Sequence, residues 1–140
     1  MSRIFWDTNL FIYLFEDYGP LSETVAQLRA KMLSRGDQLL TSTLTLGEIL
    51  VKPTERRDAA TCRKYEQTIT AVAAMVAFDL KAARLYASLR SERWLKAPDA
   101  IQLACAASVA VDLFVTNDER LQGTQVEGIQ FIVPLARVPM

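Results

Sequence analysis

The sequence contains no histidine, and this absence excludes several common kinds of catalytic centre. Without an imidazole there is no Ser-His-Asp or Cys-His triad, no histidine acting as a general acid or base, and no His-ligated zinc. Cysteine is scarce too, since Cys62 and Cys105 are the only two and lie far apart in helix-like segments. Their spacing fits neither a zinc site, a redox pair nor a disulfide framework. We therefore expect both to be packing residues in a reducing compartment.

Long hydrophobic runs are also lacking, because no apolar stretch reaches the length needed to cross a membrane. Near the N-terminus, Asp7 interrupts the apolar residues, so they do not form a signal-peptide pattern. We expect a cytoplasmic protein without membrane contact. Charge of one sign does not dominate either, since 16 Lys and Arg balance 16 Asp and Glu. This argues against a generally basic surface, although basic residues concentrate in two segments: Lys52, Arg56, Arg57, Arg63 and Lys64, then Lys81, Arg84, Arg90, Arg93 and Lys96.

What the 140 residues do contain is a regular alternation of strand-like and helix-like segments. The apolar runs predict strands at 3–6, 38–41, 75–78, 113–116 and 129–133. Helical spacing and stop signals predict helices at 9–15, 22–34, 43–51, 55–73, 79 or 80 to about 93, and 98–110, with Ser22 as a cap, Gly36 ending the second and Pro53 the third. This order is typical of an α/β domain, a parallel sheet with helices on both faces. One domain over 1–140 is expected.

Two acidic residues interrupt apolar segments in the first half of the chain. Asp7 stands between two apolar runs in RIFWDTNLFIYLFE, where an unpaired buried carboxylate would be very costly. Alternatively, it could cap the next helix. Glu48, in TLTLGEILV, shares a helix face with apolar residues. It could instead close a capping box with Thr45, although Thr43 is an equally good cap.

Two further acids show the same pattern in the second half. Asp99 lies at the start of the nearly apolar helix DAIQLACAASVA, which must be buried almost all round. A favourable charge against the helix dipole, worth about 0.3–1 kcal/mol, is the alternative role for Asp99. Asp118 ends FVTND after a strand, where it could equally be a turn residue.

All four acids fall at one end of the predicted sheet, because strand ends and the starts of the next helices meet there. Such carboxylates would repel by about 4 kcal/mol per close pair at an effective dielectric of about 20. The only basic neighbour along the sequence is Arg120, two residues after Asp118. A divalent hard cation is the natural compensator, and an all-oxygen site without histidine favours Mg²⁺ or Mn²⁺ over zinc.

The segments WDTNLFIYLFE, TLTLGEIL, KAPDAIQLACAA and LFVTNDERL resemble the PIN-domain ribonucleases, most closely VapC-type toxins of bacterial toxin–antitoxin systems. The resemblance implies a three-layer α/β/α sandwich with a central parallel sheet of about five strands. It also implies an acidic cluster, made of Asp7, Glu48, Asp99 and Asp118, that holds Mg²⁺ or Mn²⁺ and hydrolyses RNA phosphodiester bonds. Thr116 and Asn9 match polar positions of the family and are expected to support the cluster.

The residues after Asp118 depart from the family, which often has an aromatic residue there, where this chain has Glu119-Arg120-Leu121. Asp118 is therefore expected either to bind a second ion or to orient water. A cognate antitoxin and a homodimer are further implications of the resemblance. Aromatic residues could form a groove for an antitoxin segment, although internal packing is favoured for two of them, Phe11 and Phe15; the others are Tyr13, Tyr18 and Trp94.

Two other classes compete with this interpretation. A phosphoaspartate hydrolase or receiver domain also has an Asp after its first strand, but a dehalogenase-like enzyme needs a second acid where this chain has Asn9. Neither class explains Glu48. A catalytically silent PIN-like module that binds RNA or protein is the stronger alternative, and activity with Mg²⁺ or Mn²⁺ would separate the two.

Overall fold

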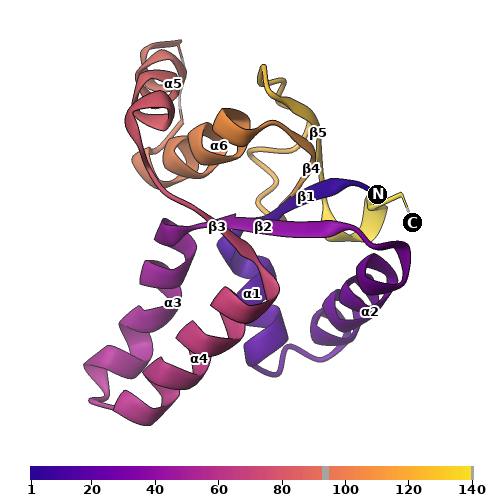
Figure 1. Ribbon diagram of the computed structural model, residues 1–140, viewed down its shortest axis with the longest axis vertical. Coiled ribbons are helices and arrows are strands. Elements are labelled where there is room, and N and C mark those ends of the chain that lie inside the picture. Colours follow the sequence, from indigo (N-terminus) through magenta and orange to yellow (C-terminus); the bar gives the residue numbers. More distant parts are fainter. Residues whose placement is uncertain (93–94, 140) are drawn as a thin grey trace.

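A computed structural model describes residues 1–92 and 95–139 and contains a central sheet of five parallel strands (Figure 1). In spatial order the strands are β3 (Ala74–Val76), β2 (Gln38–Ser42), β1 (Arg3–Trp6), β4 (Val111–Val115) and β5 (Ile129–Val133). The helices are α1 (Thr8–Phe15), α2 (Pro20–Arg35), α3 (Thr43–Glu55), α4 (Ala59–Val72), α5 (Leu80–Glu92) and α6 (Ala97–Val109), with a short 3₁₀ helix at Leu135–Arg137.

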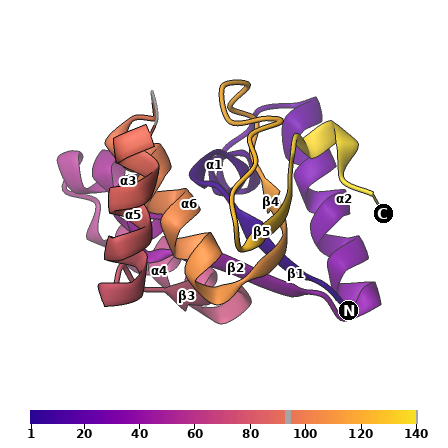
Figure 2. The same ribbon diagram turned by 90° about the horizontal axis from the view of Figure 1, so that it is seen from above.

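Helices cover both faces of the sheet, which confirms the predicted three-layer α/β/α architecture. Helices α5 and α6 lie side by side on one face, and α1 to α4 lie on the other (Figures 1 and 2). Side chains alternate along β1, so that Phe5 packs toward α6 while Ile4 and Trp6 pack toward α1 and α2. The ring of Phe5 stacks on Phe114 of the neighbouring strand with centroids 5.1 Å apart. Two apolar cores therefore hold the sheet between its helical layers.

The predicted helix α6 is buried almost all round, as its composition requires. Seven of its residues are buried, and one of these, Gln102, has a polar side chain. Phe11 and Phe15 also pack internally: Phe11 is fully buried beside Trp6, and Phe15 stacks on Tyr65 with centroids 4.7 Å apart. Trp94, and Arg93 at the expected end of α5, lie outside the described residues.

Two helix boundaries differ from the prediction around Pro53. Helix α3 does not stop before this proline but continues to Glu55, because a proline in the last turn lacks only one N–H and its carbonyl still accepts a bond from Asp58, at 2.9 Å. Helix α4 then begins at Ala59 rather than 55, since the Asp58 carboxylate caps it by accepting the Thr61 N–H at 3.0 Å.

Smaller differences occur elsewhere. Strand β3 ends at Val76 rather than 78, and α2 begins at Pro20, because proline suits a first helical position. Ser22 is therefore not its cap; the Ser22 hydroxyl accepts the Tyr18 N–H at 2.9 Å. Gly36 ends α2 as predicted, with the left-handed conformation that glycine adopts without cost. None of the described helices is long and apolar enough to cross a membrane.

Candidate active site at the carboxyl edge of the sheet

The central pair of strands places Asp7 and Thr116 opposite each other at the carboxyl edge of the sheet. In the parallel register Trp6 pairs with Val115, and the Asp7 N–H donates to the Val115 carbonyl at 3.0 Å. Thr116 is fully buried, and its hydroxyl donates to Asp7 Oδ2 at 2.7 Å. The same hydroxyl accepts the N–H of Asp118 at 3.0 Å. Thr116 thus joins two of the predicted acids, and its supporting role in a reaction stays a prediction.

The Asp7 carboxylate caps α1 and also faces the acidic edge. Its Oδ1 accepts the Thr8 N–H at 2.8 Å, so Asp7 does cap α1, as the alternative interpretation predicted. Burial raises the pKa of Asp7 to about 6, against the opposing effect of the bonds from Thr116 and Thr8. The negative charges of Asp99 and Glu48 raise this pKa further. Three of the four acids are therefore electrostatic neighbours.

Glu48 is not part of a capping box. The cap of α3 is Ser42, whose hydroxyl accepts the Thr45 N–H, and the Glu48 side chain turns instead toward α1. There Glu48 Oε1 accepts the Thr8 hydroxyl at 2.6 Å. This contact ties the acid to the residue after Asp7, so α3 presents Glu48 to the same edge of the sheet.

A buried polar network that sequence reasoning missed lies beneath these acids. The amide nitrogen of Gln102 donates to the hydroxyls of Thr45 at 2.8 Å and Thr8 at 3.0 Å, and its oxygen accepts the Ser42 hydroxyl. Thr41 extends the network by donating to the Trp6 carbonyl at 2.9 Å. In the sequence, Gln102 within the otherwise apolar segment of α6 was the feature that could have indicated this network. It fixes Thr8, and through Thr8 it positions Glu48.

Replacing Gln102 with leucine is expected to lower the free energy of unfolding by about 1–3 kcal/mol, since buried hydroxyls then lose their partners. Urea denaturation measures this loss. The same change at Gln67, which is exposed on α4, is the matched control and should have little effect. Equal stability of Gln102→Leu and the wild type would mean that water replaces the amide and that the network does not hold the site.

Asp99 and Asp118 are joined by a residue that was expected to lie near only one of them. Arg120 Nε and Nη2 bind Asp118 Oδ1 and Oδ2 at 3.0 and 2.6 Å, and Nη2 also lies 3.3 Å from Asp99 Oδ2. Asp99 is the third residue of α6, where its charge also suits the helix dipole. Hydrogen bonding from Arg120 lowers the pKa of Asp118, whereas burial and the charge of Asp118 raise the pKa of Asp99.

Asn9 lies in the first turn of α1, two residues after Asp7. Its amide oxygen is buried and, within the described residues, has no hydrogen-bond partner. No bond from Asn9 to any of the four acids is present among those residues, and its supporting role stays a prediction.

The acids have the donor chemistry of a site for a hard divalent cation, because all four supply carboxylate oxygens. Asp7 has no Lys or Arg bound to it in the described part of the chain, which leaves its charge without a cationic partner. However, no three acidic, histidine or cysteine side chains among the described residues are grouped closely enough to hold a metal ion as they stand. The carboxylate oxygens suit such a metal, but in the described residues the side chains do not converge on one position.

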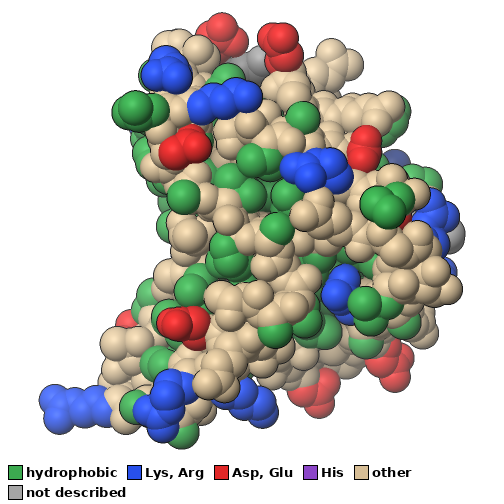
Figure 3. All heavy atoms as spheres, viewed as in Figure 1, with side chains coloured by type: hydrophobic (Ala, Val, Ile, Leu, Met, Phe, Trp, Pro, Cys, Tyr) green, Lys and Arg blue, Asp and Glu red, His purple; other side chains and the backbone are tan. Residues whose placement is uncertain are grey.

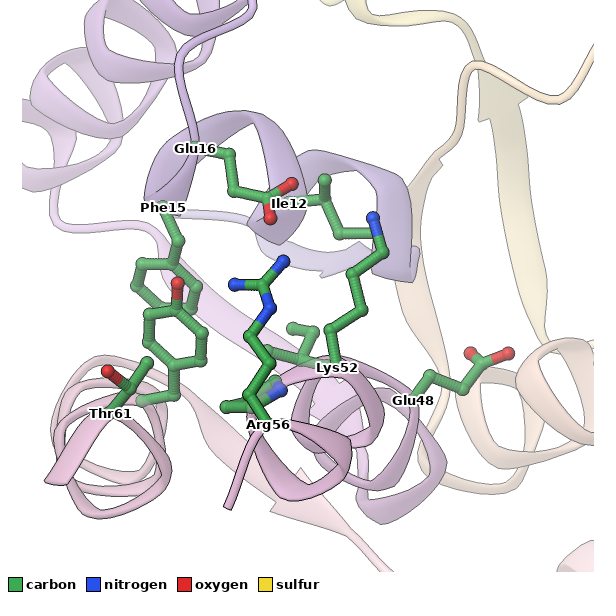
Figure 4. Close-up of a pocket in the computed structure, with 10 residues that line it drawn as sticks. Ile12, Phe15, Glu16, Glu48, Lys52, Arg56 and Thr61 are labelled. Carbon is green, nitrogen blue, oxygen red and sulfur yellow. The ribbon is translucent and has the colours of Figure 1, made fainter. Parts of the chain in front are cut away.

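A small pocket adjoins Glu48 between α1, α3 and α4. Its volume is about 80 Å³, and apolar residues, including Phe15 and Tyr65, line much of it. Figure 4 shows Lys52 and Arg56 extending from α3 across this pocket toward α1, where Glu16 lies. Positive side chains also gather on the exposed ends of α3 and α4 (Figure 3). The first basic segment of the sequence thus forms a local positive surface that begins with Lys52, one helical turn beyond Glu48, and continues to the start of α4.

Solved structures with the same fold come from bacterial complexes. They include the Rickettsia felis VapBC2 bound to a promoter DNA fragment, with a TM-score of 0.74 and 13% identity over 94% of this chain and 98% of that one. The DNA-bound VapBC of Salmonella typhimurium has a TM-score of 0.73 and 18% identity, over 96% and 99%. VapBC-5 of Mycobacterium tuberculosis has a TM-score of 0.61 and 21% identity, over 95% and 99%.

The family model described as "PIN domain" matches residues 4–126, which include all four acids of the candidate site. No curated protein sequence matches the chain. Since the family model covers most of the 140 residues, from β1 to the segment before β5, the chain belongs to the PIN-domain family.

Proposed function

We propose that this protein is a metal-dependent endoribonuclease that hydrolyses RNA phosphodiester bonds, with residues 1–140 as its nuclease domain. The observation that carries the proposal is the carboxylate of Asp7 in a PIN-domain chain. It lies at the end of the central strand, no Lys or Arg among the described residues is bound to it, and Asp99 and Glu48 are close enough to raise its pKa. An acid in such surroundings is a candidate metal ligand.

Asp7, Glu48 and Asp99 are proposed to hold Mg²⁺ or Mn²⁺, with Asp118 as a further ligand or as the residue that orients water. A bound metal would supply hydroxide near neutral pH and stabilise the leaving oxygen. Thr116 would keep Asp7 ionised by donating to its Oδ2, and Thr8 would hold Glu48 in place.

The RNA backbone is proposed to pass along α3, where Lys52 and Arg56 come after Glu48 at intervals of four residues. Because residues four apart share a helix face, Lys52 lies on the side that carries the acid, and Arg56 follows at the C-cap of α3. Both side chains line the pocket and are exposed (Figure 4), and no ion pair of either is present among the described residues. Positive charge beside a hydrolytic site favours binding of phosphate groups.

The biological role that best fits these observations is that of a VapC-type toxin in the cytoplasm. The neighbouring structures are described as VapBC or toxin–antitoxin complexes, which supports a cognate antitoxin as partner of this chain. A homodimer is proposed from the family resemblance. The second candidate function, a catalytically silent module that binds RNA or protein, is favoured by one observation, namely that no three acids in the described residues converge on one point.

Cleavage of RNA with Mg²⁺ or Mn²⁺, and its loss with EDTA, tests the proposed function directly. We expect products with a 5′-phosphate and a 3′-hydroxyl, because a metal-assisted water attacks the phosphorus. Asp99→Asn should lose cleavage at least about 100-fold while keeping its fold, which circular dichroism would verify. Full activity in EDTA would exclude the mechanism, and ends with a 2′,3′-cyclic phosphate would identify the ribose hydroxyl as the nucleophile. Absence of cleavage with either metal would favour the silent module.

A further inference from the structure

Arg120 joins two acids that are far apart in the sequence. Its side chain binds both oxygens of Asp118, which lies in the loop after β4, and its Nη2 also reaches Asp99 in the first turn of α6. The backbone N–H of Arg120 donates to Asp118 Oδ1 as well, at 3.0 Å. Two of the four acids are thus held by one guanidinium.

This contact determines what Asp118 can bind. A guanidinium that pairs with both oxygens of a carboxylate lies where a cation shared between Asp118 and Asp99 would lie. While it stays there, neither oxygen of Asp118 is free in the direction of Asp99.

The guanidinium can also leave without disrupting the fold. The side chain of Arg120 is 46% exposed, whereas those of Asp118 and Asp99 are 22% and 16% exposed. Arg120 lies in a turn between β4 and β5, outside both apolar cores. Moving it into solvent breaks an ion pair near the surface and uncovers no apolar surface of those cores, so the pair can open and close at modest cost.

We propose that Arg120 is an internal counter-ion that competes with the divalent metal for Asp118 and Asp99. Binding of the metal then displaces the arginine from the two carboxylates. By reciprocity, the free energy needed to break the ion pairs of Arg120 lowers the affinity of the site for the metal. The inference rests on the proposed metal-dependent function. It assigns to Arg120 control over metal loading rather than a direct part in cleavage.

The test compares Mn²⁺ and Mg²⁺ binding by calorimetry for the wild type, Arg120→Ala and Arg120→Lys. Arg120→Ala should bind either metal about 2- to 5-fold more tightly, because the half-exposed ion pair no longer has to break. Arg120→Lys keeps the charge but loses the two-pronged contact, so its affinity should fall between the other two. In the wild type, the Nε–H resonance of Arg120 should shift as the metal is added.

Arg35→Ala is the matched control. Arg35 also pairs with an acid two residues away, Asp37, with Nε 3.2 Å from Oδ2 and a side chain that is 50% exposed. This pair lies next to the amino end of β2, so Arg35→Ala should leave the affinity for metal unchanged. An Arg120→Ala affinity equal to or weaker than that of the wild type would overturn the competition alone. Absence of metal binding by both proteins would overturn the competition and the metal requirement of the proposed function together.

Discussion

Asp7→Asn is expected to raise the stability of the metal-free protein at pH 8 and to remove RNA cleavage. Burial raises the pKa of Asp7 from 3.8 to about 6, so the folded state holds this proton more firmly than the unfolded state does. The gap corresponds to an upper limit of about 3 kcal/mol, at about 1.36 kcal/mol per pKa unit. This cost is absent below about pH 4 and is complete above about pH 6. Asparagine avoids the cost, because it stays neutral.

Asparagine also preserves the local contacts of Asp7. Its oxygen can still accept the Thr8 N–H that caps α1, and its NH₂ group can donate to the Thr116 hydroxyl. Thermal melting in EDTA should therefore show a higher midpoint than the wild type at pH 8 and a similar midpoint at pH 4. With excess Mg²⁺ the wild type should gain about 2.7 kcal/mol at a hundredfold excess over its dissociation constant, and the variant much less. Cleavage should fall at least about 100-fold.

Asp112→Asn is a suitable control for this experiment. Asp112 lies on β4 toward the amino end of the strand, where its carboxylate accepts the Arg3 N–H at 2.7 Å. Changing it should leave cleavage intact and should produce no gain in stability between pH 4 and pH 8. If Asp7→Asn is less stable than the wild type at pH 8, the carboxylate acts mainly as the cap of α1.

Thr116→Val is expected to move the pH dependence of cleavage upward by about one pH unit. The Thr116 hydroxyl donates to the Asp7 carboxylate at 2.7 Å and so favours its charged form, which opposes the effect of burial. Valine has the same shape but no hydroxyl, so the pKa of Asp7 should rise above about 6. A hydrogen bond to a charged group is worth about 1.5–3 kcal/mol, which is enough for a rise of at least about one pH unit. Near pH 6 cleavage should fall about 5-fold, because the ionised fraction of Asp7 falls from about a half to about a tenth, and near pH 9 much less.

The measurement is the rate of RNA cleavage between pH 5 and pH 9 at a Mg²⁺ concentration below saturation, where protonation of Asp7 competes with binding of the metal. Thr41→Val is the matched control, because Thr41 is also fully buried but donates to the Trp6 carbonyl instead of to an acid. Both variants should lose stability, and only Thr116→Val should shift the profile. Profiles that coincide for Thr116→Val and the wild type would mean that Asp7 does not need this bond to remain ionised.

Local pattern along the chain was enough to predict the layered fold and the edge of the sheet at which the acids lie. Apolar runs and helical spacings record which faces are buried, so the parallel sheet could be predicted without knowledge of any long-range contact. Its topology then brings strand ends and helix starts together, which is why Asp7 and Asp118 were correctly expected at one edge. The end of α2 at Gly36 and the bounds of β5 were also predicted correctly, because helix termination and strand alternation depend on nearby residues.

The partner of each polar side chain, in contrast, depended on the tertiary structure. Glu48 accepts from Thr8, forty residues away, and Gln102 joins hydroxyls of α1, β2 and α3, because packing brings these elements together. Arg120 reaches Asp99 across twenty-one residues for the same reason. The end of α3 also differed from the local signal, since Pro53 is buried and its carbonyl accepts the Asp58 N–H. Hydrogen bonds and ion pairs act over a few ångströms in space, and a linear sequence records distance along the chain instead.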